Sequence, residues 1–150
     1  MFRGTFEHAI DDKSRVSVPA RFREILQATG DDRVVITNFH IQSTRCLDVY
    51  PLAAWAQLED RLRAQPQFDQ RVLTFSSYYV SSAQDCVLDK QGRILLPGNL
   101  RDYAGLKRDV VFTAALDKFR IWDKEAWARV FGEAEQRLMD HPEDLTALGI

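Results

Sequence analysis

The sequence is poor in the residues that build metal sites and cross-links. It has only two cysteines and three histidines among 150 residues. No Cys or carboxylate cluster has the spacing of zinc ligands, so we expect no metal and no cofactor. Cys46 and Cys86 each lie in an apolar or strand-like stretch. Two buried thiols in a reducing cytosol are therefore favoured over a disulfide, which stays open as the alternative.

Long apolar runs and catalytic motifs are also missing. No stretch approaches the ~20 apolar residues of a membrane span, and the opening MFRGTFEHAIDDK has no apolar signal region. We expect a cytoplasmic protein that contacts no membrane. No Gly-rich phosphate loop, GxGxxG or Ser-His-Asp set occurs. Asp11 and Asp89 could in principle pair as acid and base, but no nucleophile accompanies them. The sequence therefore predicts neither an enzyme nor a small-molecule substrate.

Net positive charge is lacking as well. The formal net charge is −2 and the pI is about 5.9, which argues against nucleic-acid binding because phosphate backbones attract basic proteins. The charge is uneven, however. Segment 85–108 has five Lys or Arg against three Asp, whereas 123–150 has seven Asp or Glu against three Lys or Arg. Local potential matters more than the sum, so a basic surface remains compatible with this composition.

What the chain does contain is an internal repeat with an offset of 78 residues. Segment 11–23 matches 89–101 at polar, proline and apolar positions. The matched pairs are Asp11/Asp89, Arg15/Arg93, Pro19/Pro97, Arg23/Arg101, Val16/Ile94, Val18/Leu96 and Phe22/Leu100. Segments 33–37 and 47–50 resemble 109–113 and 119–122 in the same order. We interpret this as a duplication, which decides how the fold is assembled.

Each copy predicts the same series of short elements. Two strands flank a polar turn and open the copy as a β-hairpin; a proline then ends the second strand and begins a short helix. The first copy is expected to have strands 5–10 and 15–18, helix 20–28, strands 34–38 and 46–50, and a helix at about 52–64. The second copy is expected to have strands 85–88 and 93–96, helix 98–103, strands 109–114 and 118–122, and a helix at about 123–139.

A single hairpin cannot bury a face from water, so we expect the two copies to share one core around a pseudo-twofold axis. The predicted fold is α+β, a duplicated β-hairpin/helix unit that forms one barrel-like domain, 1–150, with peripheral helices. The first repeat covers about 1–66 and the second about 85–139. Helical spacing of Phe68, Val72, Phe75 and Tyr79 predicts a connecting helix at about 67–84. Residues 140–150 form a tail.

The two turns, Asp11-Asp-Lys-Ser-Arg15 and Asp89-Lys-Gln-Gly-Arg93, are the candidate binding sites. An Asp at the start of a turn accepts backbone N–H groups and can hold the Arg guanidinium as a bidentate pair. A pre-positioned Arg suits guanine O6 and N7, and Lys13 and Lys90 suit phosphate. One Asp-x-x-x-Arg turn is more often a surface salt bridge, but two at equivalent positions favour a paired grip on a duplex.

Arg3, Arg21 and Arg23 are ambiguous. Arg3, near the start, could reach DNA. Arg23 and Arg101 recur on the short helices. Their recurrence fits either an ion pair at the repeat interface or a phosphate contact, and the ion pair is slightly favoured.

The chain resembles the MraZ family of bacterial transcription regulators over nearly its whole length. The resemblance rests on Met1-Phe-Arg-Gly4, on 11–23, and on 89–101 followed by Tyr103-Ala-Gly-Leu106. It implies a swapped-hairpin, AbrB-like double-split barrel in a ring-shaped homo-oligomer, with Asp11, Arg15, Asp89 and Arg93 facing double-stranded DNA. It also implies a nucleoid-associated, sequence-specific regulator that binds repeats upstream of the division and cell-wall gene cluster and usually represses that operon. Ser14 departs from the family's usual Gly.

The alternative is a non-catalytic protein-interaction module on the same fold, either antitoxin-like or a scaffold. The acidic segment 133–150 would suit that role, although such segments are more often solvated surface. A steep dependence of DNA affinity on salt would distinguish the regulator from the interaction module.

Overall fold

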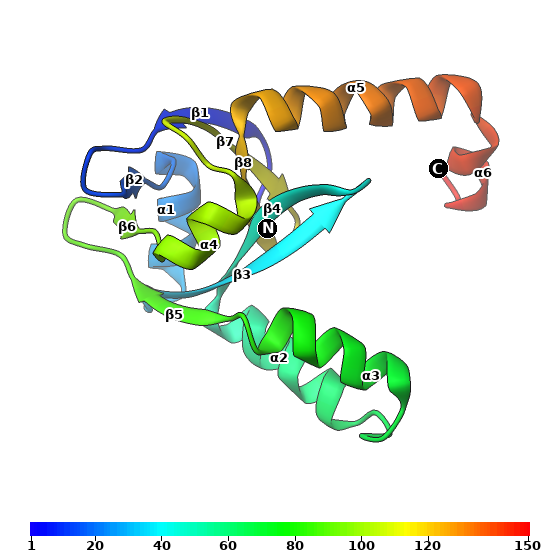
Figure 1. Cartoon of the computed structure of the whole chain (residues 1–150), viewed down its shortest axis with the longest axis horizontal. Coiled ribbons are helices and arrows are strands. Elements are labelled where there is room, and N and C mark those ends of the chain that lie inside the picture. Colours follow the sequence, from blue (N-terminus) through cyan, green and yellow to red (C-terminus); the bar gives the residue numbers. More distant parts are fainter.

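Two antiparallel sheets organise the chain, and the computed structural model describes all of residues 1–150 (Figure 1). The larger sheet has the strand order β1-β7-β8-β4-β3-β5, and the smaller pairs β2 with β6. The strands are β1 (Thr5–Ala9), β2 (Arg15–Ser17), β3 (Arg33–Ile41), β4 (Thr44–Pro51), β5 (Gln84–Val87), β6 (Arg93–Leu95), β7 (Asp109–Ala115) and β8 (Lys118–Asp123). The α+β class expected from the sequence is confirmed.

Helices fill the connections between these strands. They are α1 (Ala20–Ala28), α2 (Leu52–Arg63), α3 (Gln70–Phe75), the π-helical turn η1 (Ser76–Val80), α4 (Gly98–Ala104), α5 (Lys124–Asp140) and α6 (Glu143–Ala147). Pro19, Pro51 and Pro97 directly precede α1, α2 and α4, with φ between −58° and −51°. Proline lacks the N–H that a strand ladder needs, and its fixed φ suits the start of a helix. The helices therefore begin where the sequence predicts.

The main core lies between the large sheet, α1, α4 and the small sheet. It contains 19 buried apolar residues. Phe22 is fully buried and packs edge-on against Phe2 at a ring-centroid distance of 5.2 Å, and its ring lies 4.9 Å from that of Phe119. Aromatic pairs in these arrangements add to the stabilisation that burial alone provides. Residues from both halves of the chain thus share one core.

Two helical parts extend from this body, as Figure 1 shows. The α2–α3 pair packs on a separate apolar cluster around Trp55 and Tyr79. Helix α5 packs only its first half, through Val130, and carries α6 beyond the body. None of the helices combines the length and apolar character needed to cross a bilayer.

A buried carboxylate joins the sheet to η1. Asp48 on β4 is 1% exposed; its Oδ1 accepts Arg120 Nε at 2.8 Å, and its Oδ2 accepts the hydroxyl of Tyr79. Burial raises the pKa of Asp48, and the nearby Arg120 guanidinium opposes that rise. The Tyr79 carbonyl accepts Thr37 Oγ1 at 2.6 Å. This network, which the sequence patterns did not predict, fixes η1 against β3 and β4.

The predicted pairing within each opening hairpin is wrong. β1 pairs with β7 and β5 with β3, whereas β2 pairs with β6 of the other half in the register Val16↔Ile94. An isolated two-stranded hairpin is only marginally stable, because it cannot bury an apolar face. Pairing across the two halves buries Val16 and Ile94 against each other at 1% and 0% exposure. The strands that flank each turn therefore enter different sheets.

The other predicted elements agree with the structure, apart from their ends. The strand pairs β3–β4 and β7–β8 are confirmed. The connecting helix is shorter than 67–84, because Asp69 caps its start by accepting Arg71 N at 2.8 Å and β5 begins at Gln84. Phe68 precedes the cap and is 95% exposed, so it does not belong to the helix face. Both cysteines are free thiols as expected, although Cys86 is only half-buried.

Candidate nucleic-acid interface

The two Asp-x-x-x-Arg turns have nearly the same hydrogen-bond geometry. In the first, Asp11 Oδ1 accepts Lys13 N at 2.9 Å and Arg15 N at 2.8 Å, and Asp11 Oδ2 accepts Arg15 Nε at 2.8 Å. A backbone bond from Asp11 N to the Arg15 carbonyl, 2.8 Å long, closes the turn. One carboxylate therefore fixes both the backbone of the turn and the stem of its arginine.

The second turn repeats this arrangement. Asp89 Oδ1 accepts Gln91 N and Arg93 N, each at 2.9 Å, and Asp89 Oδ2 accepts Arg93 Nε at 2.8 Å. The backbone closure from Asp89 N to the Arg93 carbonyl is 3.0 Å long. In both turns the N–H groups of the arginine and of the residue two positions after the Asp hold the aspartate pKa below its ordinary value, the arginine backbone N–H contributing most.

The expected bidentate pairing of each Asp with its guanidinium is wrong. The Asp oxygen reaches only Nε, because the other oxygen is taken by two backbone N–H groups. Nη1 and Nη2 of Arg15 and Arg93 consequently donate to no protein atom. The side chains of Arg15 and Arg93 are 30% and 27% exposed. Each turn thus presents a restrained arginine whose two terminal nitrogens are free to meet a ligand.

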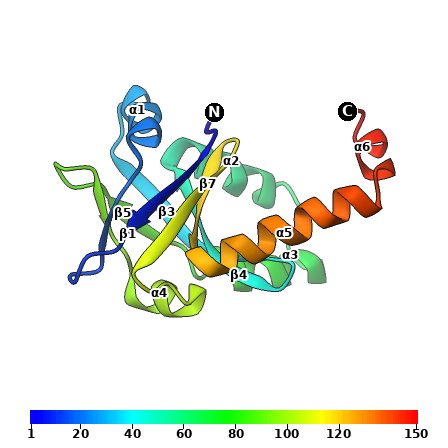
Figure 2. The same ribbon diagram turned by 90° about the horizontal axis from the view of Figure 1, so that it is seen from above.

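The structure brings both turns to one end of the molecule. They project side by side from the same end, on the left of Figure 1, and Figure 2 shows them at the same end from above. Two bonds tie them to each other's strands: Val18 N donates to the Gly92 carbonyl and Leu96 N to the Ser14 carbonyl, each at 2.9 Å. The pairing of β2 with β6 therefore sets the spacing of the two arginines.

The turns differ at one residue. Gly92 has φ +75°, and Ser14 adopts the same left-handed region at φ +62°. A Cβ on Gly92 would lie 2.2 Å from Arg23 Cδ, so glycine suits both the left-handed backbone and the close approach of the Arg23 side chain, which an added Cβ would displace. The shape of the first turn, which Ser14 left open in the sequence, is the same as that of the second.

Arg23 and Arg101 reach from the short helix of one half to the turn of the other. Arg23 Nη1 donates to the Gln91 carbonyl at 3.0 Å, and Arg101 Nη1 donates to Ser14 Oγ. Neither arginine forms an ion pair with a carboxylate. The favoured interpretation of an ion pair at the repeat interface is therefore wrong: the contacts do join the two halves, but their acceptors are a carbonyl and a hydroxyl.

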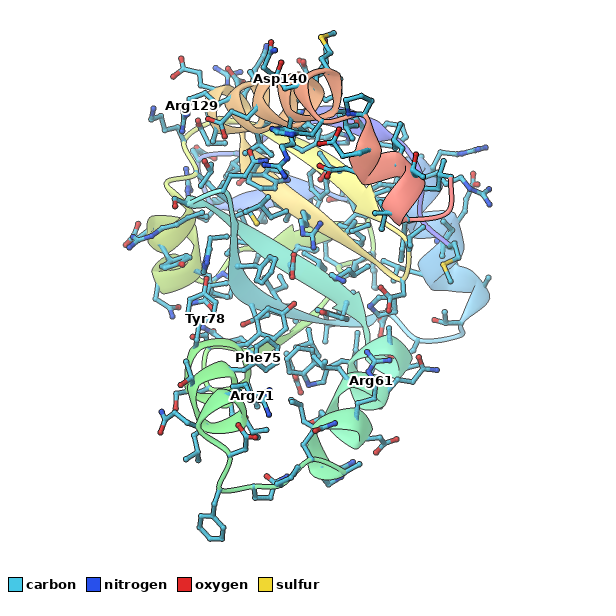
Figure 3. All side chains as sticks on the ribbon, turned by 90° about the vertical axis from the view of Figure 1, so that its right-hand side faces the viewer. Arg61, Arg71, Phe75, Tyr78, Arg129 and Asp140 are labelled. Carbon is cyan, nitrogen blue, oxygen red and sulfur yellow. The ribbon has the colours of Figure 1, made fainter.

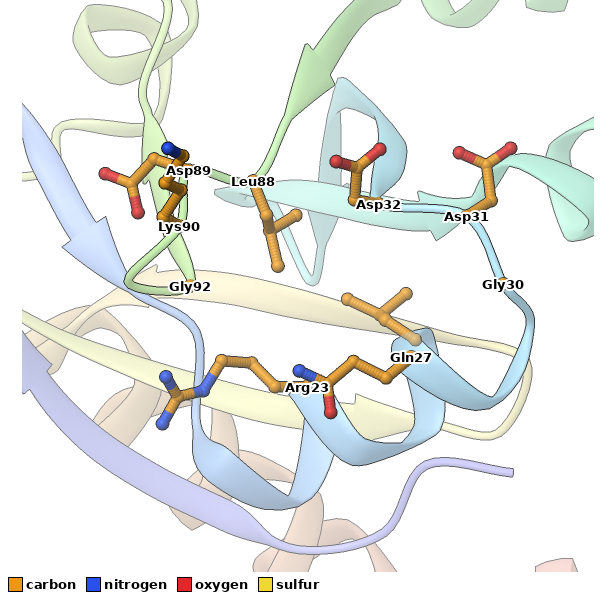
Figure 4. A pocket seen from close by; sticks show the side chains of 10 residues that line it. Arg23, Gln27, Gly30, Asp31, Asp32, Leu88, Asp89, Lys90 and Gly92 are labelled. Atoms are coloured by element: carbon orange, nitrogen blue, oxygen red, sulfur yellow. The ribbon is translucent and has the colours of Figure 1, made fainter.

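Shallow depressions flank both turns. Figure 4 shows the one beside the second turn, where Arg23 lies under Gly92 and Asp31 and Asp32 stand on the opposite rim. The depression beside the first turn is lined by Asp11, Asp12, Arg101 and Arg108, together with Ala9 and Ile10.

The remaining candidate residues differ in where they lie. Lys13 and Lys90 are exposed at the tips of the turns and form no ion pair. Arg3 is also exposed, but it precedes β1, whose five residues separate it from the first turn by about 17 Å at ~3.3 Å per residue. The structure therefore brings the two lysines to the site and leaves Arg3 away from it.

This architecture defines a class of α+β proteins that present paired arginine turns and carry no evident catalytic constellation. A sequence model of the MraZ protein family, described as antitoxin-like, matches residues 1–75 and 80–148. "Transcriptional regulator MraZ" of Desulfitobacterium hafniense (strain DSM 10664 / DCB-2) is 43% identical over 150 residues, covering 100% of both chains. The protein of that name from Natranaerobius thermophilus is 39% identical over 150 residues, again covering 100% of both. The one from Salinispora arenicola is 43% identical over 140 residues, 93% of this chain and 94% of its own.

The chain belongs to the MraZ family. The family and the names of these relatives indicate a transcription regulator and not an enzyme. The resemblance noted in the sequence is confirmed.

Proposed function

We propose that the protein is a sequence-specific DNA-binding transcription regulator that grips the duplex through its two Asp-x-x-x-Arg turns. The observation that carries this proposal is the pair of restrained arginines, Arg15 and Arg93, whose terminal nitrogens are free at one end of the molecule. Nη1 and Nη2 are suited to the paired acceptors O6 and N7 of guanine in the major groove. Asp11 and Asp89 act by positioning these arginines.

Lys13 and Lys90 contact phosphates on either side of the bases read by the arginines. Their exposure and lack of ion-pair partners support this role, since an ammonium serves as a point charge for phosphate. Arg3 is at most a peripheral backbone contact, because it lies away from the turns.

The fold that supports these turns is a pseudo-twofold, swapped-hairpin double-split barrel of the AbrB-like kind. The pairing of β2 from one repeat with β6 from the other supports this proposal, as do the equivalent hydrogen bonds of the two turns. The repeats cover about 1–66 and about 85–139 of a single domain, 1–150, with a connecting helix and a tail at 140–150. The two segments matched by the family, 1–75 and 80–148, support the duplication.

The regulator acts on its own operon in the division and cell-wall gene cluster, as a nucleoid-associated repressor that binds upstream DNA repeats. It assembles as a ring-shaped homo-oligomer. Because the net charge is −2, a single subunit is expected to bind DNA weakly. Several subunits bound to successive repeats would multiply the affinity. Repeats must lie about 10 base pairs apart for neighbouring subunits to meet the same face of the duplex.

DNA-binding measurements on the region upstream of its own gene test the proposal. The double variant R15A/R93A is expected to lose at least about 30-fold in affinity, because each bidentate arginine–base contact contributes about 1–3 kcal/mol. The matched control is R61A/R129A, which removes the same charge from α2 and α5 on the side turned away from the turns (Figure 3). Footprinting identifies the repeats.

Normal DNA binding by R15A/R93A would refute the site. A second candidate is the non-catalytic protein-interaction module, which the exposed apolar residues Phe131, Met139 and Leu148 of α5 and its C-terminal extension favour. If the wild-type protein shows no salt-dependent binding to either the upstream or the scrambled DNA, this second function replaces the first.

A further inference from the structure

The two cross-repeat arginines are equivalent by position but differ in how many of their nitrogens are occupied. Arg101 on α4 donates through all three: Nε to the Leu106 carbonyl at 3.1 Å, Nη2 to the Lys107 carbonyl at 3.1 Å, and Nη1 to Ser14 Oγ. Its guanidinium is saturated by the protein. Arg101 therefore has no group left over for a ligand.

Arg23 on α1 is held by one hydrogen bond alone. Nη1 donates to the Gln91 carbonyl at 3.0 Å, whereas Nε and Nη2 donate to no protein atom. The aliphatic part of the side chain lies against Gly92, and the guanidinium points along the second turn (Figure 4). The cation is half-buried and has no carboxylate partner. Asp31, on the far rim of the same depression, is already bound by Arg33 through two hydrogen bonds of 2.8 and 2.9 Å.

The fourth residue of each turn explains part of this difference. Ser14 offers a hydroxyl, which captures Nη1 of Arg101. Gly92 offers no side chain, and the space above it is filled by the stem of Arg23. This Ser/Gly difference accounts for one of the three hydrogen bonds of Arg101. The other two go to the Leu106 and Lys107 carbonyls, which have no counterpart among the hydrogen bonds of Arg23.

We infer that Arg23 is a further DNA contact, a phosphate-binding cation beside Arg93, whereas Arg101 is a positioning residue only. This inference rests on the proposed function. The stem of Arg23 is already packed and one of its nitrogens is already bonded, so little side-chain freedom is lost when a phosphate binds. Arg23 reaches from α1 to the turn that contains Lys90, and the second turn consequently has one more phosphate contact beside it than the first. A protein with two pseudo-equivalent turns would then bind each DNA repeat with a fixed polarity.

The test compares R23Q, R23K and R101Q by the salt dependence of affinity for the upstream DNA and for a scrambled duplex. R23Q is expected to reduce the slope of log affinity against log salt by about 1. It should also lower the affinity for the upstream and the scrambled duplex by a similar factor, as removal of a phosphate contact does. R23K keeps the charge and is expected to keep the wild-type slope. R101Q is expected to keep that slope while lowering the unfolding temperature, because it removes three hydrogen bonds to the protein.

A wild-type slope for R23Q would overturn the inference, and so would an equal loss of slope in R23Q and R101Q. Both results leave the proposed function intact provided that R15A/R93A still shows its expected loss of affinity, so the two failures are distinguishable.

Discussion

Replacing Gly92 by alanine tests the contact between Arg23 and the second turn directly. Gly92 has φ +75°, and an L-residue in this region costs about 1–2 kcal/mol. The new Cβ would also lie 2.2 Å from Arg23 Cδ and 2.6 Å from Nη1. The arginine is flexible and will move away, losing its bond to the Gln91 carbonyl, which is worth about 1 kcal/mol for a half-exposed group. We expect G92A to lower the free energy of unfolding by about 2–3 kcal/mol.

The matched control is G105A at the end of α4. Gly105 has φ +63° but nothing lies within 4 Å of its added Cβ, so only the backbone contribution of about 1–2 kcal/mol is expected. Urea unfolding followed by tryptophan fluorescence at one fixed protein concentration measures both. In an R23A background the cost of G92A should fall to that of G105A. Equal costs for G92A and G105A in the wild-type background, or an unchanged cost of G92A without Arg23, would refute the reasoning.

Three other outcomes follow from the structure. D48N should destabilise the protein by about 3 kcal/mol in urea unfolding, because it leaves the Arg120 cation half-buried without its partner; a change below about 1 kcal/mol would contradict this. The folded-state pKa of Asp11 and Asp89 is lowered, so their stabilisation is fully present above the ordinary value of 3.8 and is lost progressively as the pH falls from there through the lower folded-state pKa. The stability difference between wild type and D11N/D89N should accordingly shrink between pH 5 and 2.5, and a constant difference would exclude the anchoring. Burial raises the pKa of the Cys46 thiol, so iodoacetamide should label it only in unfolded protein, as judged by mass spectrometry.

Local sequence signals located the elements well. Helix α1 begins and ends at the predicted residues, Ala20 and Ala28, because Pro19 and Gly30 flank it. The turn aspartates accept backbone N–H groups as their position at the start of a polar turn indicates. These features depend on residues within five positions of one another, which a single sequence displays.

The features that the sequence did not reveal depend on distant partners. Nothing near Val16 indicates that its strand pairs with the one around Ile94 and not with the strand just before it. The single Nε contact of Arg15 follows from competition with backbone N–H groups for the same carboxylate. Asp48 lies in an ordinary strand pattern, and only the approach of Arg120 from β8 and of the connecting helix explains why it is buried.

The pairing of β1 with β7 and of β2 with β6 determines when the chain can fold during its synthesis. Residues 5–9 have no strand to join until residues 109–113 have left the ribosome, and residues 15–17 wait for 93–95. Domains usually fold as units once their sequence has emerged, and here the unit is nearly the entire polypeptide. A nascent or prematurely terminated product therefore holds the complete first turn in its sequence but lacks the strand that β2 must join, so only the finished chain presents both turns together.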